Sequence, residues 1–434
     1  MLIKNNIIEY LEVALSSLKK EEVIFRYTQK LDLKKNWDNL ICNDKQIFHI
    51  SYPNDDTYIG FGQCKTYTIK VGKDFEELKK IKFTHLSYGC KKRISPKLFG
   101  GVAFNINQQA KDIWENIPNV LFYLPKLLIT KIENEYYISY HSIINKQTNI
   151  NEINKEYVGY TKIIKKSHVI ENNISFQKNI PDRVEYKKIF ESYIENIKLK
   201  NINKAILSRV KIYKSKNKVS LISKLPHSTN FSFKLNTNKY FFGSTPEILI
   251  KSNNRNYNTL ALAGTLIKDN SEINNSLLED EKELQEHKYV VENIADILKP
   301  LSSNISYGRT PKILELKDLC HLSTPITGLL KQNIHILDLL FKLYPTPAVL
   351  GLPKQDALDL ILKYELIHRG WYGGCIGWFD LKGNGRFDVS IRSALQNKNT
   401  VYFYAGGGIL EESILDKEWQ EAESKFLQLL SALY

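Results

Sequence analysis

The chain has 434 residues, of which 43% are hydrophobic and 25% are charged, and its formal net charge at pH 7 is +14. This length suffices for one large domain or for two to three ordinary ones, and the composition is that of a soluble globular protein. The sequence has no run of about 18 apolar residues, so a transmembrane helix is not expected. The N-terminal segment lacks the apolar stretch and cleavage site of a signal peptide, so we expect an amphipathic N-terminal helix and a cytoplasmic protein.

The excess positive charge is spread along the chain. Lysines alternate with Asn and Ile, which indicates a codon bias toward these three residues, and no basic stripe with interleaved aromatic residues occurs. A nucleic-acid partner is therefore not expected, although the charge favours small anionic substrates by steering. The five cysteines form no C-x-x-C pair. This argues against a disulfide framework and against zinc, and we expect them to be small buried side chains.

The N-terminal part, up to about residue 170, alternates short strands and turns. Glycine-punctuated or apolar runs predict strands at 58–64, 98–105 and 121–132. Residues 133–180 are polar and rich in Asn and Lys, so we expect hairpin pieces and a long exposed connection there. A helix is expected to follow at 182–200.

The C-terminal part combines β-rich runs with longer helices, without an internal repeat or a linker. In chain order, the pattern predicts strands at 204–213 and 239–252, helices at 276–299 and 353–363, a meander at 374–404 and a last helix at 415–433. Hairpins interrupted by long helices favour an α+β fold with antiparallel sheets over a doubly wound parallel sheet.

Two of the predicted helices each carry a Glu-x-x-Glu pair, Glu283 with Glu286 and Glu418 with Glu421. Residues three apart lie on one helix face, so each helix can direct two carboxylates toward one point. In the first helix, three aliphatic residues continue that face: Val290, Ile294 and Ile297. Carboxylates on a buried face are costly unless they are paired or bind a metal, and oxygen ligands favour Mg²⁺ or Ca²⁺. Lys425 lies one turn after Glu421, where a surface ion pair is the simpler interpretation.

Three further residues could act on a substrate. Lys204 begins a strand-like run, and a lysine at the end of a buried strand can act as a base. Glu247 follows a tight turn, and a carboxyl in a partly apolar pocket can stay protonated and serve as a general acid. Arg392 is expected on a strand with small neighbours, which leaves room for a bidentate contact with a carboxylate. Taken alone, each is more often an ordinary surface, turn or edge-strand residue, so their joint occurrence carries the hypothesis.

Segments rich in glycine and proline could shape a pocket. An apolar run ends at Gly264 and Thr265, where glycine permits the close approach of a backbone N–H to a ligand carboxylate. Residues 321–328 and 344–353 are expected to be stiff loops. The glycine-rich run 404–409 lacks the spacing and the lysine of nucleotide-binding loops. Its amides are expected to hold a carboxylate instead.

The order of these motifs resembles that of the chorismate-utilising enzymes and, among them, the isochorismate synthases of menaquinone and siderophore biosynthesis. The matching runs are KAILSR, FGSTPEIL, LALAGT, KELQEH, HLSTPITG, YPTPAVLGLP, RGWYGGCIGWFD, VSIRSA, YAGGGI and EWQEAESK. The match is strong over about 200–434 and looser before it. The resemblance implies an α+β fold of two stacked antiparallel β-sheets flanked by helices. It also implies one chorismate-utilising domain over residues 1–434, with 1–180 as its N-terminal half and 181–434 as its catalytic core.

The resemblance further implies an isomerase that converts chorismate into isochorismate with Mg²⁺, by attack of water at ring C2 and loss of the C4 hydroxyl. Lys204 would activate the water and Glu247 would protonate the departing hydroxyl. The implied metal ligands are Glu286 and Glu421, supported by Glu283 and Glu418. The implied substrate-binding residues are Gly264, Thr265, Ala348, Arg392, Gly406 and Lys425.

Two positions separate the branches of this family. Relatives that transfer an amine typically carry Gln where this chain has Lys204, and aminodeoxychorismate synthases carry Lys where it has Ala263. No Leu-Leu-Glu-Ser tryptophan-binding signature occurs near the N-terminus. Anthranilate and aminodeoxychorismate synthesis are therefore not expected, nor is a glutamine amidotransferase subunit, and we expect a monomer or weak homodimer.

Two alternatives to isochorismate synthesis stay open. Salicylate synthases share the lysine and the glutamate, and they eliminate pyruvate after isochorismate forms. A non-catalytic homologue could bind chorismate without converting it. Of the pathways that use isochorismate, we expect synthesis of menaquinone or phylloquinone ahead of a siderophore or salicylate route.

Overall fold

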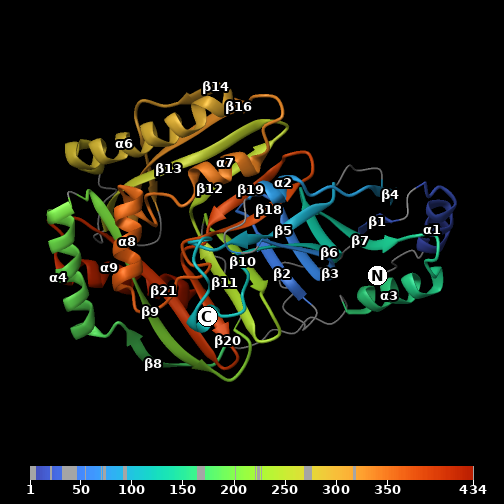
Figure 1. The fold of residues 1–434 in the computed structure, drawn as a ribbon, viewed down its shortest axis with the longest axis horizontal. Coiled ribbons are helices and arrows are strands. Elements are labelled where there is room, and N and C mark those ends of the chain that lie inside the picture. The colour runs from blue at the N-terminus through green and yellow to red at the C-terminus, as the bar shows by residue number, and fades with distance from the viewer. Residues whose placement is uncertain are drawn as a thin grey trace.

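Long antiparallel strands make up most of the chain, and helices cover their outer faces (Figure 1). This computed structural model describes residues 6–19, 22–31, 46–53, 55–69, 71, 75–90, 95–163, 172–200, 202–219, 221, 225, 227–267, 276–315 and 319–433. The described helices are α1 (Ile7–Ser16), α2 (Glu76–Lys79), α3 (Ile150–Ile163), α4 (Arg183–Lys200), α5 (Ser276–Glu279), α6 (Glu281–Leu298), α7 (Ile336–Leu343), α8 (Lys354–Tyr364) and α9 (Leu415–Ser431). None of these helices is long and apolar enough to cross a membrane.

The strands fall into an N-terminal and a C-terminal series. The N-terminal series is β1 (Val23–Leu31), β2 (Gln46–Ser51), β3 (Thr57–Ile69), β4 (His85–Gly89), β5 (Lys97–Val102), β6 (Val120–Ile132), β7 (Glu135–Ile144) and β8 (Ile174–Ile180). The C-terminal series is β9 (Lys204–Ser215), β10 (Thr229–Lys234), β11 (Lys239–Thr245), β12 (Ile248–Asn253), β13 (Asn256–Ile267), β14 (Ser302–Tyr307), β15 (Lys312–Glu315), β16 (Leu319–Leu330), β17 (Gly351–Leu352), β18 (Cys375–Asp380), β19 (Gly385–Val389), β20 (Ser393–Asn397) and β21 (Thr400–Ile409).

Strand β6 is the place where the sheet divides into two lobes. One edge of β6 pairs first with β5 and then with β7, and its other edge pairs with β3. One lobe continues from β3 through β2, β10, β11, β20, β21 and β9 to β8. The other continues from β5 through β18, β19, β12 and β13 to β16. The expected α+β class with antiparallel sheets is confirmed, and the two sheets are joined edge to edge through β3 and β6.

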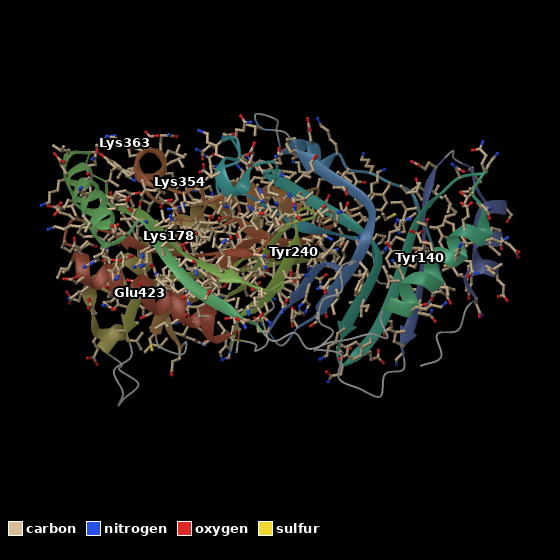
Figure 2. All side chains as sticks on the ribbon, turned by 90° about the horizontal axis from the view of Figure 1, so that it is seen from below. Tyr140, Lys178, Tyr240, Lys354, Lys363 and Glu423 are labelled. Carbon is tan, nitrogen blue, oxygen red and sulfur yellow. The ribbon has the colours of Figure 1, made fainter. Side chains whose placement is uncertain are left out.

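Aromatic side chains from both lobes form a shared core. Phe48 of β2 stacks on Phe99 of β5 with ring centroids 4.4 Å apart, and Phe233 of β10 packs against Trp371. All four are buried. A separate apolar cluster at the N-terminal end holds Tyr140, which lies at the opposite end of the molecule from Lys363 of α8 (Figure 2).

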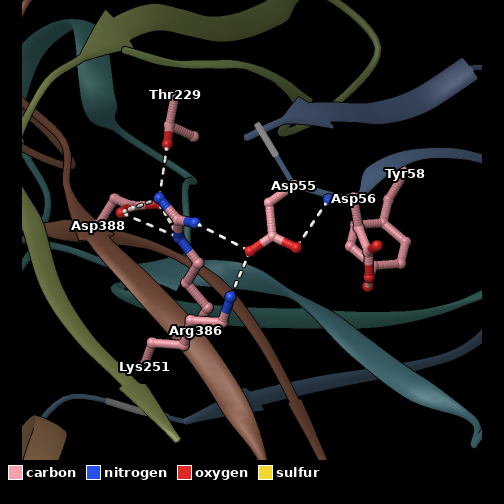
Figure 3. A network of polar contacts seen from close by, with 7 residues as sticks. All are labelled: Asp55, Asp56, Tyr58, Thr229, Lys251, Arg386 and Asp388. Carbon is pink, nitrogen blue, oxygen red and sulfur yellow. Dashed lines mark hydrogen bonds and ion pairs between the residues drawn. The ribbon is translucent and has the colours of Figure 1, made fainter. Parts of the chain in front are cut away.

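A charge network, buried at Arg386 and Asp388, also connects the two halves of the chain (Figure 3). Arg386 of β19 lies 3.3 Å from a carboxylate oxygen of Asp388 and donates to the Thr229 hydroxyl at 3.2 Å. It also lies 3.5 Å from the carboxylate of Asp55, which follows β2 and accepts from Lys251 of β12. Burial raises the pKa of Asp388, and the Arg386 charge partly offsets this. The network joins the turn after β2 to strands of both lobes.

Most of the predicted elements are confirmed. The strands at 58–64, 98–105 and 121–132 fall in β3, β5 and β6, and the helices at 182–200 and 415–433 are α4 and α9. The predicted helix at 276–299 is divided into α5 and α6, because the Asp280 side chain accepts from the Glu283 amide at 3.1 Å and caps a new helix start. The helix expected from residue 353 begins one residue later, with Pro353 at its N-cap.

Two predictions for connecting segments are wrong. Residues 321–328 lie in β16 and not in a stiff loop, because Leu322, Thr324 and Ile326 are buried with the two-residue period of a strand. Residues 133–180 form β7, α3 and β8. The expected hairpin is confirmed, because β7 pairs with β6 across the turn after Ile132, but α3 stands in place of the expected long connection; 164–171 lie outside the described residues. The Asn149 side chain accepts from the Asn151 amide at 2.9 Å, so an asparagine that was taken for a loop residue caps a helix.

The buried face of α6 differs from the predicted one. The fully buried residues are His287, Val291, Ala295 and Leu298. The aliphatic residues expected on that face are half-buried, as are Glu283 and Glu286: Val290, Ile294 and Ile297. The helix packs against β13 and β16 (Figure 1). Because Glu283 and Glu286 are half-buried, they lie at the margin of this contact.

The described cysteines have free thiols. Cys320 and Cys375 are buried as expected, and Cys64 and Cys90 are half-buried. Cys42 lies outside the described residues.

Candidate active site

Lys204 is the first residue of β9, which pairs with the glycine-rich strand β21. A Cβ atom on Gly408 would lie 2.2 Å from Cε of Lys204, so the lysine side chain lies directly against the Gly408 backbone, in space that any other residue's side chain would fill. Its Nζ donates to Oε1 of Glu286 on α6 at 3.1 Å. Both side chains are 31% exposed, so the ion pair is accessible to solvent and solutes.

Helix α9 brings two more glutamates to the neighbouring stretch of β21. Lys425 donates to Glu421 at 2.5 Å and to the Gly406 carbonyl at 2.7 Å, and its charge lowers the pKa of Glu421. Glu418 accepts from the Ser413 hydroxyl at 2.8 Å through Oε1. Its Oε2 is buried and has no hydrogen-bond partner among the described residues. Burial raises the pKa of Glu418, and Glu421 adds to this.

The Glu418 carboxylate also lies close to the β21 backbone, since a Cβ atom on Gly407 would lie 3.1 Å from Glu418 Oε2. The Lys204 charge lowers the pKa of Glu418 and of Glu421, which places both near the lysine that Glu286 binds. Carboxylates of α6 and α9 thus approach Lys204 from two helices. No three described His, Cys, Asp or Glu side chains are close enough to form a preassembled metal cluster. The all-oxygen donor set and the unpartnered Oε2 fit a hard divalent cation.

Glu247 lies directly before β12. Its carbonyl accepts from the Val389 amide at 2.9 Å, and its amide donates to the Thr245 hydroxyl at 3.3 Å. Burial raises the pKa of Glu247 to about 7, although the charges of Arg392, Lys425 and Lys204 act to lower it. A carboxyl with this pKa is about half protonated at neutral pH, so a substantial fraction can act as a general acid.

Arg392 does not lie on a strand, and this part of the prediction is wrong. Strand β19 ends at Val389 and β20 begins at Ser393, and Arg392 stands between them with φ +48°. The Arg392 carbonyl accepts from the Ser244 amide at 3.0 Å, so a backbone contact with the end of β11 holds this kink. The side chain is 7% exposed, and its charge acts on the pKa values of Glu247 and His321. The kink, and not strand alternation, places this guanidinium.

Gly264 stands at a bulge in β13, where the pairing with β16 shifts between Ala263 and Thr265. Its φ is +75°, a conformation that favours glycine. A Cβ atom on Gly264 would lie 3.2 Å from Oε2 of Glu283, so this backbone lies beside a carboxylate of α6. Thr265 pairs with His321, and its side chain lies outside the described residues.

His321 is a site residue that sequence reasoning missed. Burial, together with the charges of Arg392 and Lys425, lowers its pKa to about 4. The imidazole is therefore neutral at neutral pH and lies near both cations. Its signal was the alternating strand pattern of 321–328, which was interpreted as a loop.

Ala348 is exposed in the turn that leads into β17. Leu352 of β17 pairs with Lys204, so this turn lies beside the start of β9. The Ala348 side chain is exposed, and its place in the site stays a prediction.

A buried ion pair behind the turn was also missed. Arg369 and Glu365 are 3% and 4% exposed. Glu365 accepts from the Ser208 amide at 2.8 Å, and Arg369 donates to the carbonyls of Ile206 at 3.1 Å and Val349 at 2.6 Å. The pair therefore connects the β9 backbone to the turn that carries Ala348.

Comparison with known proteins shows the family and the fold of this chain. Isochorismate synthase MenF of Bacillus subtilis (strain 168) is 29% identical over 357 residues, which are 78% of this chain and 75% of that protein. Isochorismate synthase EntC of Escherichia coli (strain K12) is 33% identical over 216 residues, or 49% of this chain and 55% of that protein. The solved structure of MenF, the menaquinone-specific isochorismate synthase from Escherichia coli, shares the fold with a TM-score of 0.79 at 21% identity, over 98% of this chain and 99% of that one. The family described as chorismate binding enzyme matches residues 12–434, and the chain belongs to this family.

Proposed function

We propose that this protein is an isochorismate synthase, an isomerase that converts chorismate reversibly into isochorismate in the presence of Mg²⁺. The observation that carries the proposal is the combination of Lys204, at the start of β9, with a Glu247 carboxyl whose pKa is raised to about 7 and on which the Lys204 charge acts. Relatives named isochorismate synthases, with MenF and EntC among them, support the same reaction.

Chorismate carries two carboxylates, and the site offers matching cations and amides. Arg392 is buried to 7% exposure, and Lys425 lies at the Gly406 carbonyl. We assign both cations, with the backbones of Gly264 and Gly406, to the substrate carboxylates. Thr265 and Ala348 are assigned to the wall of the same pocket.

The reaction needs a base at C2 and an acid at C4. In the proposed reaction, Lys204 takes a proton from water while the water oxygen forms a bond to C2. The ring double bonds shift, the C4–O bond breaks, and the Glu247 carboxyl protonates the departing hydroxyl, which leaves as water. In the reverse direction the two groups exchange roles. General acid and base catalysis typically contribute about 10²- to 10⁴-fold each.

The carboxylates of α6 and α9 form the proposed Mg²⁺ site. Glu286 and Glu421 would be its direct ligands, with Glu283 and Glu418 in support. Bound Mg²⁺ would neutralise and orient a substrate carboxylate. The unpartnered Oε2 of Glu418 supports this assignment, because a buried carboxylate oxygen is costly without a partner.

The test is incubation of the purified protein with chorismate and Mg²⁺, with separation of the products by chromatography and a parallel assay for pyruvate. Isochorismate without pyruvate is the expected result. Salicylate with stoichiometric pyruvate would assign the protein to the salicylate synthases. No conversion at any Mg²⁺ concentration would leave only a non-catalytic, chorismate-binding role.

The wider assignments are proposals of the same kind. We propose a role in menaquinone or phylloquinone synthesis, which the MenF relatives support, ahead of a siderophore role. We also propose that the protein acts in the cytoplasm as a monomer or weak homodimer. It would act without an amidotransferase subunit, a nucleic acid or a membrane. Residues 1–434 are proposed to act as one domain, which the pairing of β5 with β18 and of β2 with β10 supports.

A further inference from the structure

His287 follows Glu286 on α6 and lies one turn after Glu283, and it is 2% exposed. It is the first residue of the helix's fully buried face. Its two ring nitrogens have separate partners on two strands. Nδ1 lies 3.3 Å from the Ala263 carbonyl of β13, and Nε2 lies 2.7 Å from the Thr324 hydroxyl of β16.

These two partners determine how the ring is protonated. A carbonyl oxygen only accepts, so Nδ1 carries the proton and donates to Ala263. Nε2 is then the acceptor, and the Thr324 hydroxyl donates to it. The ring is neutral in this arrangement, and burial, which lowers the pKa of His287, favours the same form. Both hydrogen bonds therefore have fixed directions.

Ala263 directly precedes the Gly264 bulge, and the Glu283 carboxylate lies against that bulge. Thr324 lies on the same strand as His321. One imidazole thus connects the helix that carries Glu283 and Glu286 with two strands that line the proposed site. If this position only filled space, a leucine or phenylalanine would do so without the free-energy cost of burying polar nitrogens. An imidazole offsets that cost only when both nitrogens form hydrogen bonds.

We propose that His287 is a positioning residue, which holds the α6 carboxylates and the Gly264 backbone in one fixed arrangement. The inference rests on the proposed function, in which those carboxylates hold Mg²⁺ and that backbone contacts the substrate. Loss of the ring's hydrogen bonds would let helix and bulge move independently. Mg²⁺ affinity and chorismate binding would then weaken together.

The test compares His287→Phe, His287→Asn and Thr324→Val with the wild type. Mg²⁺ affinity is measured by calorimetry on the free protein, and KM and kcat for chorismate are measured separately. His287→Phe keeps the bulk and loses both bonds, and we expect about a tenfold or larger rise in both the Mg²⁺ Kd and the chorismate KM. His287→Asn retains a donor near the Ala263 carbonyl and should recover most of the KM loss. Thr324→Val removes one hydroxyl and should show the same two changes at a smaller size.

His335 provides the matched control, because both of its ring nitrogens also have partners: it accepts from the Leu337 amide and lies 3.1 Å from the Asp380 carbonyl. His335→Gln should lower Tm and leave the Mg²⁺ Kd and KM unchanged. A His287→Phe protein with a lowered Tm but wild-type Mg²⁺ Kd and KM would overturn the proposal. If His287→Phe does not fold, unchanged constants in Thr324→Val would overturn it equally. Failure of the proposed function is separate, since the wild type would then convert no chorismate, whereas the Mg²⁺ titration would still report on His287.

Discussion

The Nζ atom of Lys204 donates to Glu286 Oε1 at 3.1 Å, so the proposed base is paired with a proposed metal ligand. In this contact the lysine is a hydrogen-bond donor, whereas a base must offer a free electron pair to the water. The lysine can act as a base only when Glu286 turns to another partner. We therefore infer that the ion pair is a resting arrangement and that, under the proposed function, Lys204 and Mg²⁺ would compete for the Glu286 carboxylate.

Lys204→Ala separates these two roles. We expect kcat to fall by at least about 10²-fold, because the base is lost. The same variant should bind Mg²⁺ at least as tightly as the wild type, because Glu286 no longer pairs with an ammonium group. Calorimetric Mg²⁺ titration and a steady-state assay measure the two effects. Near-normal turnover would remove Lys204 from the mechanism; Lys363→Ala, at an exposed position of α8, is the control for loss of a positive charge.

Gly408→Ala tests the position of Lys204 by placing a methyl group where the lysine side chain lies. The new methyl group would lie 2.2 Å from Lys204 Cε, and the lysine must move because its flexible end is the closest neighbour. We expect a loss of kcat of about tenfold or more with little change in Tm. Gly159→Ala on α3 is the matched control, because no described atom lies within 4 Å of its Cβ position. That control should retain full activity and gain about 0.5–1 kcal/mol of stability, as expected for alanine in a helix. Equal activity of the two variants would argue against the lysine placement.

Sequence patterns predicted on which strand or helix several candidate site residues lie, but they did not predict the local backbone at Arg392. Lys204 could be placed at a strand start because the run that follows it is β-rich, and the Glu-x-x-Glu pairs followed from helical spacing alone. Arg392 was misplaced because φ +48° depends on a carbonyl contact with Ser244, which is 148 residues away in sequence and leaves no local pattern. His287 was missed because its significance lies in partners on two distant strands.

The loop prediction for residues 321–328 was wrong for a related reason. The run 321–328 contains proline and glycine, which locally favour a loop, but Leu322 and Ile326 are buried in a strand paired on both edges. Tertiary burial outweighed local propensity there. The branch at β6 likewise depends on which strands meet its two edges, and a single sequence does not encode that pairing locally.

Glu247 should make activity depend on pH. Its folded-state pKa of about 7 lies above the ordinary value of 4.5, so the fraction of protonated acid falls as pH rises through 7. We expect kcat/KM to decline above about pH 7, and Glu247→Gln to lose most activity together with this decline. The same group also affects folding: its stabilising contribution is fully present below pH 4.5 and is lost as pH rises through 7. Urea unfolding at pH 5 and pH 8 should show a smaller difference for Glu247→Gln than for the wild type, and equal differences would contradict the raised pKa.

Glu421→Gln tests the metal assignment. Glu421 is held as a carboxylate by Lys425 at 2.5 Å, and a neutral amide would remove a charged ligand. We expect the Mg²⁺ concentration for half-maximal activity to rise by about tenfold or more, because carboxylate charge contributes strongly to binding of hard cations. Glu423→Gln, two residues along α9, is the control: its partners are Arg209 and Lys211. A Glu421→Gln protein with an unchanged Mg²⁺ titration would exclude this residue from the metal site.

The Glu365–Arg369 pair should matter for both stability and geometry. Removing one partner leaves the other charge buried and unpaired, which typically costs about 3–5 kcal/mol. Arg369→Leu should therefore lower the free energy of unfolding by this amount in urea titrations, and replacing both residues with apolar ones should restore part of it. Because Arg369 also donates to the carbonyls of Ile206 and Val349, the restored double variant should keep a raised chorismate KM. A double variant with both normal stability and normal KM would show that the pair does not position the turn beside β9.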